Sequence, residues 1–473
     1  MAELILAVDV GTTSMRAAVF APDGAILGLA ARPLVSHSPS PGLVEQDAEA
    51  VWTATRAAMA EAIERAGRTA SDLAALGVTT QRASAVVWDR ETGAATSPLV
   101  VWNDLRGVDR ARDLAAAGFL LAPQQAATKL EAILASIDAP PSRMAWGAID
   151  SFLIHRLSGG AAHVTDRSQA WPTGYLDFAT LTWNEALIAF QRLDPATFPR
   201  LVDTWGDLAM TSAEVLGAVI PIAADIADQQ SALLAHGEAP GTAKLTFGTA
   251  GVFDLATGGN FVFPGPGTPP LIVSSVGGET RFCVEGMVLS AGQALDWLRD
   301  RFGLGAPAEF DALAGSVGDT AGAAFFPALQ GLGAPDQDPR RRAMLAGLSA
   351  AVDRAHLARA GLEGLAFRAR EIVDHIYERV DLAPPDALGV DGGLSRSSVF
   401  LQILADLTGR TVRRHATPEA TLLGAAMAAG RGAGLLTDSE EVAMRRFEAS
   451  VAPGIGPDEA AERFASWRAQ VYS

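Results

Sequence analysis

The stretch that decides the fold runs from Leu6 to Phe20 and reads LAVDVGTTSMRAAVF. Two apolar runs flank a turn of small residues that begins at Gly11, and Asp9 stands at the tip of the first run. Taken alone, the pattern is typical of a β-hairpin whose Asp and Thr side chains satisfy the turn. The other interpretation is that Asp9 faces a metal ion while the N–H groups and hydroxyls of the turn bind phosphate. Features elsewhere in the sequence are needed to choose between these two interpretations.

Composition limits the class of protein. A chain of 473 residues is too long for one compact core, which predicts two large domains. The net charge of −17 disfavours nucleic acid or an anionic membrane as the main partner, although a small phosphorylated ligand needs only local donors. Cys283 is the only cysteine, so no intrachain disulfide can form. Neither a signal peptide nor a bilayer-long apolar stretch is recognisable, and we expect a cytoplasmic protein.

The order of strand and helix patterns predicts an α/β protein with a repeated unit. After the opening hairpin, we expect strands at 26–34, 76–79, 85–88 and 99–102, a helix at 47–66 and a mainly helical region at 104–157. A strand–turn–strand pattern returns at 244–256. A long helix at 353–380, a strand at 387–391 and helices at 397–408 and 419–429 follow. The restart predicts a domain boundary between 239 and 240, giving domains 1–239 and 240–473.

Three glycine turns at strand ends are candidate contacts for a nucleotide. They begin at Gly11, Gly248 and Gly392, and the first two stand in the repeated strand–turn–strand context. A single turn of this kind is more often structural, but three in one chain favour phosphate binding. Arg16, just after the first turn, offers phosphate a positive charge, or is a solvated strand residue. A lysine-containing P-loop motif is absent from the sequence.

Asp228 is the candidate general base. It ends a small apolar run and opens a helical pattern, so the ordinary interpretation is a helix N-cap. Phosphoryl transfer to an alcohol requires a carboxylate near the acceptor hydroxyl and Mg²⁺ on the transferred group. Asp9 and Asp228 would divide these two tasks if they meet in space.

Arg82, Trp102 and Asp104 follow two predicted strands and are candidates for an acceptor pocket. An apolar wall combined with hydrogen-bonding groups suits a polyhydroxyl ligand. The alternative is an interdomain ion pair beside a packed tryptophan.

Motifs spread along almost the whole chain make it resemble the FGGY carbohydrate kinases. The opening stretch DVGTTSMRAAVF resembles the first phosphate motif of that family, and TFGTAG resembles the second. GVTTQRASAVVWD and VVWNDLRG resemble its sugar-side strands, and IADQQSALLAHG resembles the segment with its catalytic aspartate. GVDGGLSRSSVFLQILADLTG resembles its adenosine motif. AMLAGLSAAVDRAHLARAGLEGLAF resembles its C-terminal signature, with Gly361 as a mild departure.

The resemblance implies an α/β protein of two actin-like ATPase (ribonuclease H-like) domains, with ATP and Mg²⁺ in the cleft between them. It implies a general base at Asp228, with Gln229 beside it, and a Mg²⁺-side carboxylate at Asp9. Phosphate and nucleotide contacts are implied at Gly11, Thr12, Thr13, Arg16, Gly248, Thr249, Gly292, Gly392, Gly393 and Ser397, where Ser397 replaces a usual Asn. The acceptor pocket is implied at Arg82, Trp102 and Asp104.

Two departures concern the acceptor. The glycerol-kinase branch, which the chain resembles most, reads Gln-Arg-Glu where this chain reads Gln81-Arg82-Ala83. Its pocket tyrosine aligns with Gln124. Both losses weaken the case for glycerol, because buried hydroxyls need matched partners. Ala83 also opens volume for a longer polyol or a ketose.

The sequence therefore predicts an ATP-dependent kinase that phosphorylates a terminal hydroxyl of a small sugar or polyol. A xylulose-type ketopentose kinase is the nearest alternative. More distant ones are a nucleotide switch of the actin or chaperone type, which needs no acceptor pocket, and an inactive sugar sensor. We expect no nucleic-acid or membrane partner, and a homodimer stays open as an alternative to a monomer.

Overall fold

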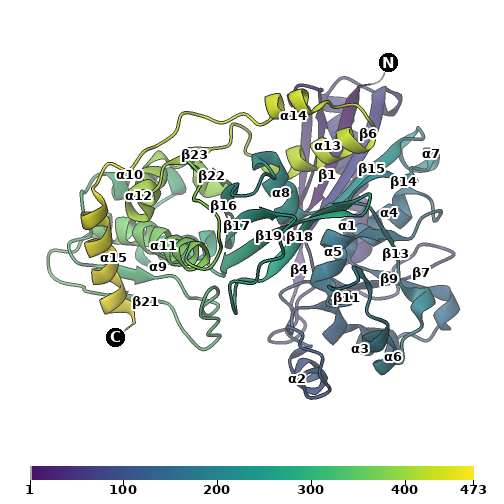
Figure 1. The fold of residues 1–473 in the computed structure, drawn as a ribbon, viewed down its shortest axis with the longest axis horizontal. Helices are drawn as coiled ribbons and strands as arrows, with labels where there is room; N and C mark the ends of the chain where they lie inside the picture. Colours follow the sequence, from purple (N-terminus) through teal and green to yellow (C-terminus); the bar gives the residue numbers. More distant parts are fainter. Residues whose placement is uncertain (1–2, 473) are drawn as a thin grey trace. The chain divides into compact units, whose positions relative to one another are not determined.

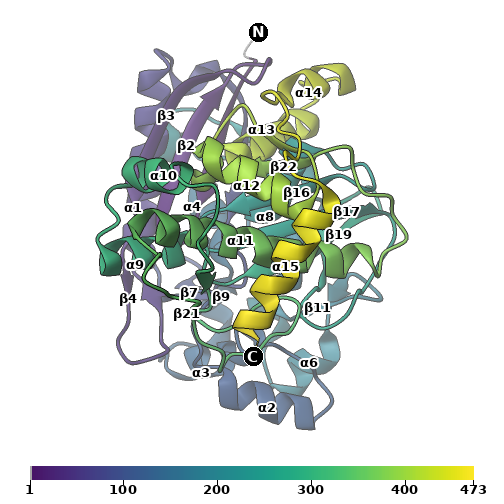
Figure 2. The ribbon, with the colours of Figure 1, turned by 90° about the vertical axis from the view of Figure 1, so that its left-hand side faces the viewer.

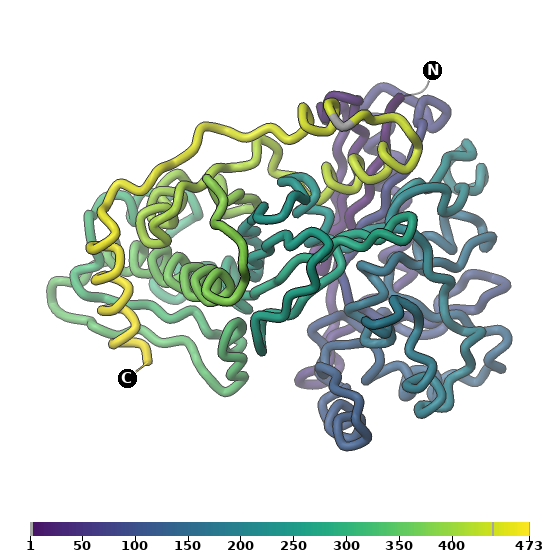
Figure 3. The backbone as a smooth tube through the Cα atoms, viewed as in Figure 1, coloured from purple at the N-terminus to yellow at the C-terminus, as the bar shows by residue number. Residues whose placement is uncertain are grey.

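The structure, a computed structural model, describes residues 3–472. Contacts between Cα atoms divide it into two compact units. The first contains the chain up to Ala235, together with Ile272–Arg281 and Thr421–Met444, and the second contains His236–Leu271, Phe282–Ala420 and the chain from Arg445 onwards. The units therefore break four residues before the expected boundary, and two later segments return to the first unit. Figure 3 shows the second of these segments, in yellow-green, running back to the purple strands.

The first unit is built on a mixed sheet of six strands in the order β14-β15-β6-β1-β2-β3. These strands are β1 (Leu4–Val10), β2 (Ser14–Phe20), β3 (Ile26–Pro33), β6 (Leu73–Thr80), β14 (Trp205–Met210) and β15 (Pro221–Ala227). β1, β6 and β15 run parallel, whereas β2, β3 and β14 are antiparallel to their neighbours. The predicted hairpin and third strand are confirmed. Six of the seven residues of β1 are buried, as the unbroken apolar run indicates for a central strand.

Two helices pack against this sheet, one on each face, and each approaches it most closely at a glycine of a strand. Asp47 caps α1 (Ala48–Arg65) by accepting from two backbone N–H groups, which confirms the helix predicted at 47–66. A Cβ on Gly28 of β3 would lie 2.1 Å from the carbonyl oxygen of Ala62 in α1. A Cβ on Gly77 of β6 would lie 2.3 Å from that of Ala425 in α13 (Ala420–Gly432). Both helix backbones therefore lie directly against the sheet. Figure 1 shows α13 beside β1 and β6.

The first unit has a second, smaller hydrophobic core that contains Trp146 and Tyr175, both of which are fully buried. The region 104–157 is mainly helical, as predicted, but it also contains β9 (Met144–Gly147), an apolar segment that pairs antiparallel with β7 (Val86–Asp89). Four residues with no local partner cannot be told from a buried turn of helix by pattern alone. The remaining elements of the unit are β4 (Ser36–His37), β5 (Glu45–Gln46), β8 (Leu99–Val100), α2 (Val108–Ala116), α3 (Leu130–Ala135), α4 (Ile149–Leu157), β10 (Val164–Asp166), α5 (Arg167–Ala170), β11 (Leu176–Asp177), β12 (Thr182–Trp183), α6 (Glu185–Phe190), β13 (Arg200–Val202), α7 (Ala213–Leu216), α8 (Asp228–His236) and α14 (Asp438–Met444).

The second sheet repeats the strand–turn–strand arrangement of the first. Its order is β18-β19-β17-β16-β22-β23, and β16 is antiparallel to β17 and parallel to β22, as β1 is to β2 and β6. The repeat predicted from the glycine turns is thus confirmed. The strands are β16 (Ala243–Phe247), β17 (Gly251–Gly258), β18 (Pro270–Val276), β19 (Glu279–Val288), β22 (Leu388–Asp391) and β23 (Val412–Arg414).

Helix α11 (Arg354–Tyr377) forms the core of the second unit, as the long pattern at 353–380 predicts. A Cβ on Gly361 would lie 2.8 Å from a methyl group of Leu298, so this glycine brings α11 close to α9 (Gly292–Phe302). Phe367 of α11 stacks on Trp467 of α15 (Pro457–Val471), with 5.1 Å between ring centroids. Figure 2 shows α15, in yellow, passing in front of α11. The other elements are α10 (Pro307–Gly315), β20 (Ala324–Phe326), β21 (Met344–Ala346) and α12 (Ser398–Thr408).

Candidate active site

Three candidate residues gather at one edge of the first sheet. Asp9 lies near the carboxyl end of β1, Arg82 two residues beyond the end of β6, and Asp228 directly after β15. These strands are adjacent and parallel, and Thr80 of β6 is in register with both Val10 of β1 and Ala227 of β15. The carboxyl edge of parallel strands is where α/β proteins place their ligands. The structure thus shows that the ends of β1, β6 and β15 lie together, which the spacing of residues in the sequence cannot show.

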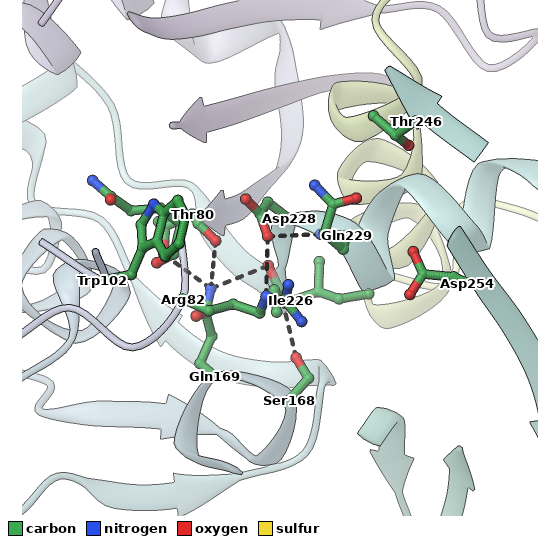
Figure 4. A network of polar contacts seen from close by, with 12 residues as sticks. Thr80, Arg82, Trp102, Ser168, Gln169, Ile226, Asp228, Gln229, Thr246 and Asp254 are labelled. Carbon is green, nitrogen blue, oxygen red and sulfur yellow. Dashed lines mark hydrogen bonds and ion pairs between the residues drawn. The ribbon is translucent and has the colours of Figure 1, made fainter. Parts of the chain in front are cut away.

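Arg82 and Asp228 form an ion pair. The Nε atom of Arg82 lies 3.4 Å from Oδ1 of Asp228, with side chains 13% and 23% exposed (Figure 4). The same Oδ1 accepts the backbone N–H of Gln229 at 2.8 Å, at the first turn of α8. Asp228 is therefore the first residue of α8 and not the N-cap residue before it, and it is partly open beside a cation, as a general base requires.

The opening turn lies beside Asp9. Asp9 and Arg16 are cross-strand neighbours, with 3.9 Å between their charged groups, and the Asp9 side chain is 10% exposed. The turn is closed by the Gly11 N–H, which donates to the carbonyl of Ser14 at 3.1 Å. Thr13 at its tip is exposed and can reach a ligand.

The hydroxyl of Thr12 takes part in a polar network that sequence reasoning missed. Nε1–H of Trp102 donates to Thr12 Oγ1 at 3.0 Å, and Thr12 Oγ1 donates to Gln81 Oε1 at 3.2 Å. The only hydroxyl proton of Thr12 is thus directed at Gln81. A phosphate would meet the backbone N–H of this residue, not its hydroxyl proton. Gln81 was named in the sequence only as part of the Gln81-Arg82-Ala83 motif, and its type alone gives no functional signal.

Asp104 forms an ion pair with Arg106 inside the first unit, not the interdomain pair that the sequence left open as an alternative. It is fully buried, and its carboxylate accepts from Arg106 at 2.8 Å on each oxygen and from the Val44 N–H at 2.7 Å. Burial raises the pKa of Asp104, but these hydrogen bonds outweigh it and bring the pKa below its ordinary value. Asp104 thereby anchors the loop that carries Trp102, which is half-buried.

The two positions expected to set the acceptor differ in exposure. Ala83 is buried at 9% exposure with φ of 57°, in the left-handed region, and follows Arg82 directly. Gln124 is exposed in the loop before the short helical turn Ala126–Thr128. Near that loop, Lys129 is buried and its ammonium donates to the Val101 carbonyl at 3.3 Å, and burial lowers the pKa of Lys129 to about 8.

Gln169 links the strand ends that carry the ion pair. Its side chain is fully buried, and its amide nitrogen donates to Thr80 Oγ1 at 2.9 Å, within 3.3 Å of the Thr80 carbonyl and 3.4 Å of the Ile226 carbonyl (Figure 4). Thr80 is two residues before Arg82, and Ile226 is two residues before Asp228. Gln169 therefore fixes the spacing of the two charged groups from behind.

Three buried carboxyl groups lie beneath this edge: Asp150, Asp166 and Asp225. Asp225 of β15 accepts the backbone N–H of Asp166 at 2.9 Å. Burial raises the pKa of Asp225 well above its ordinary value, and the charges of Asp150 and Asp166 raise it further. Burial also raises the pKa of Asp166 to about 6 and that of Asp150 above its ordinary value.

In the second unit, the expected nucleotide turns meet at the end of β16. The Gly292 N–H donates to the Gly248 carbonyl at 2.9 Å, and a Cβ on Gly292 would lie 2.6 Å from that oxygen. Thr249 is part of the same junction, because its carbonyl accepts the N–H of Ala291 at 3.0 Å. Gly392 has φ of 82°, and a Cβ there would lie 2.5 Å from the Phe247 carbonyl.

Two further second-unit residues have clear surroundings. A Cβ on Gly393 would meet nothing within 4 Å, so its backbone is open to a ligand. The Ser397 hydroxyl donates to Asp311 at 2.6 Å and accepts the Phe400 N–H at 2.9 Å as the N-cap of α12. The Ser397 hydroxyl is therefore already engaged in capping α12 and in the hydrogen bond to Asp311.

Lys244 is not available for phosphate. Its ammonium lies 2.7 Å from Asp254 and 2.8 Å from Thr246 Oγ1, and both charged side chains are fully buried. Burial acts to lower the pKa of Lys244, but the neighbouring carboxylates raise it overall. This is an internal charge pair, so a phosphate bound in this unit would have to be held by other groups than the Lys244 ammonium. Within residues 3–472, no helix is long and apolar enough to cross a membrane.

Comparison with known proteins agrees with this geometry. Residues 4–235 match the N-terminal domain model of the FGGY family of carbohydrate kinases, and residues 243–433 match its C-terminal domain model. A glycerol kinase of Geobacter sp. (strain M21) is 41% identical over 468 residues, covering 94% of each chain.

Solved structures agree as well. The glycerol kinase of Plasmodium falciparum, crystallised with ADP, superimposes with a TM-score of 0.89 at 25% identity over 98% of this chain and 97% of that one. A xylulose kinase from Rhodospirillum rubrum gives a TM-score of 0.82 at 27% identity over 98% of both chains. The expected α/β fold of two actin-like domains is confirmed. The chain belongs to the FGGY family of carbohydrate kinases, and it is an ATP-dependent phosphotransferase that acts on an alcohol group.

Proposed function

We propose that this kinase transfers the γ-phosphoryl group of ATP to a terminal hydroxyl of a small linear polyol, with Asp228 as the general base. The observation that carries the proposal is the Arg82–Asp228 pair at 3.4 Å, on the strand edge that also bears Asp9. A carboxylate that is partly open and fixed by a guanidinium suits the removal of a proton from a bound hydroxyl.

The residues of the chain divide the reaction as follows. Asp228 accepts the proton of the acceptor hydroxyl as its oxygen forms a bond to the γ-phosphorus and the bond to the ADP oxygen breaks. Arg82 orients Asp228 and donates hydrogen bonds to neighbouring hydroxyls of the acceptor. Trp102 supplies an apolar wall for the carbon chain. The backbone of the Gly11–Ser14 and Gly248–Gly251 turns donates to the phosphate oxygens.

Asp9 fits the role of the carboxylate for Mg²⁺. Within the described residues, no three acidic, His or Cys side chains are placed to hold a metal ion among themselves. Mg²⁺ in kinases needs only one or two carboxylates, because phosphate oxygens and waters complete its shell. Asp9 is such a carboxylate, 10% exposed and next to the phosphate turn. The ion, when bound, neutralises charge on the phosphates.

A polyol is favoured because the curated relatives are glycerol kinases. Ala83 next to Arg82 has only a methyl group, which leaves room for a chain longer than glycerol. The four-carbon polyol erythritol is therefore tested beside glycerol itself.

A coupled ADP-release assay over glycerol, erythritol, ribitol, xylulose, ribulose and gluconate tests the proposal. We expect the highest kcat/KM for a polyol, and no acceptor-stimulated ADP release with any compound would refute the proposal. A preference for xylulose over every polyol would support the ketopentose alternative instead.

A further inference from the structure

A chain of hydrogen bonds joins the acceptor side of the first unit to its phosphate turn. An indole N–H can only donate, so Trp102 Nε1 donates to Thr12 Oγ1, and the Thr12 proton must go to Gln81 Oε1. The direction of each bond is therefore fixed by chemistry. Trp102 is the half-buried wall of the proposed acceptor pocket, and Thr12 lies in the turn proposed to bind phosphate.

Two buried glutamines close this chain around Thr12. Gln81 and Gln46 are 1% and 2% exposed. Gln81 Nε2 donates to Gln46 Oε1 and to the Gly11 carbonyl, each at 3.4 Å, and Gln46 Nε2 donates to the Thr12 carbonyl at 2.6 Å. Turning the Gln81 amide over would set its oxygen against two other oxygens. The two amides thus hold one arrangement of the turn.

The position of the indole consequently affects the phosphate turn. If the indole moves, Thr12 loses a donor, and the hydroxyl can rotate away from Gln81. An acceptor that packs against Trp102 fixes the indole and, with it, the ring of hydrogen bonds around Thr12. A turn that is already ordered binds phosphate at a smaller cost in conformational entropy.

We infer that Gln81 is a positioning residue that couples acceptor binding at Trp102 to nucleotide binding at the Gly11–Ser14 turn. The inference rests on the proposed function, because it requires an acceptor at Trp102. Gln81 acts through Thr12, whose hydroxyl donates to it. Since linkage is reciprocal, the acceptor strengthens nucleotide binding by the same factor as the nucleotide strengthens acceptor binding. One well-placed hydrogen bond corresponds to a coupling factor of about fivefold.

The coupling factor is measured by calorimetry. Mg²⁺ and the non-hydrolysable analogue AMP-PNP are titrated into the full chain with and without a saturating amount of the polyol that gives the highest kcat/KM. For the wild type we expect the Kd of AMP-PNP to fall about fivefold when the polyol is present. In Gln81→Met and in Trp102→Phe, which keeps an aromatic ring without the N–H, we expect the two Kd values to agree within experimental error.

Gln191→Met is the matched control. Gln191 is also a buried glutamine of the first unit, but it bonds to Tyr175, Ala127 and Glu131, away from the turn. This variant should keep the wild-type coupling. Circular dichroism checks the fold of each variant, and Trp102→Phe still tests the inference if Gln81→Met fails to fold.

Undiminished coupling in Trp102→Phe or in a folded Gln81→Met would overturn the inference, as would a wild type with no coupling at all. A wild type that releases no ADP in response to any acceptor would instead refute the proposed function. The two failures are therefore distinguishable.

Discussion

The buried carboxyl cluster gives a prediction about stability and pH. Asp166 has its pKa raised to about 6 by burial, from an ordinary 3.8. A raised pKa means that the folded chain binds this proton more tightly than the unfolded chain. The contribution to stability is therefore complete below about pH 4 and is lost as the pH rises through 6. The difference between these pKa values corresponds to about 3 kcal/mol of unfolding free energy.

Asp225→Asn tests this reasoning. Burial and the charges of Asp150 and Asp166 raise the pKa of Asp225 well above its ordinary value, so the folded chain keeps this carboxyl group protonated. Asp225→Asn replaces it with an amide, which needs no proton to stay uncharged. The amide oxygen can still accept the Asp166 N–H. We expect the variant to match the wild type near pH 4.5. At pH 8 it should be more stable by about 2 kcal/mol, or about 2 °C in Tm for a chain of 473 residues, because the wild type must keep on folding a proton that Asp225 releases in the unfolded chain, and the amide carries no such cost.

The assay is thermal and urea unfolding of both chains from pH 4.5 to 8.5, followed by circular dichroism. Asp225→Ala is the control. It leaves the Asp166 N–H without its acceptor and should destabilise at every pH. A stability difference between Asp225→Asn and the wild type that does not change with pH would refute the reasoning.

Two further predictions concern the two units separately. Gln169→Leu removes the hydrogen bonds to Thr80 and Ile226 that set the spacing of Arg82 and Asp228. Steady-state kinetics should therefore show kcat lowered about tenfold, with a smaller change in the KM for the polyol. An unchanged kcat would show that Gln169 has no part in positioning the pair. Gly392→Ala places a Cβ 2.5 Å from the Phe247 carbonyl, at a residue with positive φ, and should raise the Kd for ATP at least tenfold by calorimetry. Gly393→Ala adds a Cβ in open space and should change that Kd less than threefold. Equal effects of the two substitutions would contradict the assigned geometry.

Local pattern was sufficient for the elements of this fold that carry their own signal. The hairpin from Leu6 to Phe20 and its repeat after residue 243 are visible because apolar runs flank small-residue turns. Helix α1 is marked by its cap at Asp47. β9 was missed because its four residues gain strand character only from pairing with β7.

The candidate site was predictable in its charged residues but not in their partners. Asp9, Arg82 and Asp228 stand at strand ends in the sequence, and the order of the sheet brings those ends together. The ion pair of Asp104 with Arg106 was not predicted, since only an interdomain pair was considered, and a carboxylate looks the same in sequence whether it binds a ligand or a neighbouring arginine.

The glutamines that support the site have no sequence signal of their own. Gln46, Gln81 and Gln169 act through hydrogen bonds to residues 34 to 89 positions away, and such bonds depend on the finished fold. The same holds for the Ser397 hydroxyl, which is directed at Asp311.

In the proposed mechanism, Asp228 removes the proton from the acceptor hydroxyl. The most direct measurement compares Asp228→Asn with the wild type in two assays: acceptor-dependent ADP release and calorimetric binding of AMP-PNP with Mg²⁺. General-base catalysis is worth about 10²- to 10⁴-fold, so we expect kcat to fall by at least a hundredfold while the Kd for AMP-PNP stays within about twofold. A kcat within tenfold of the wild type would contradict the account.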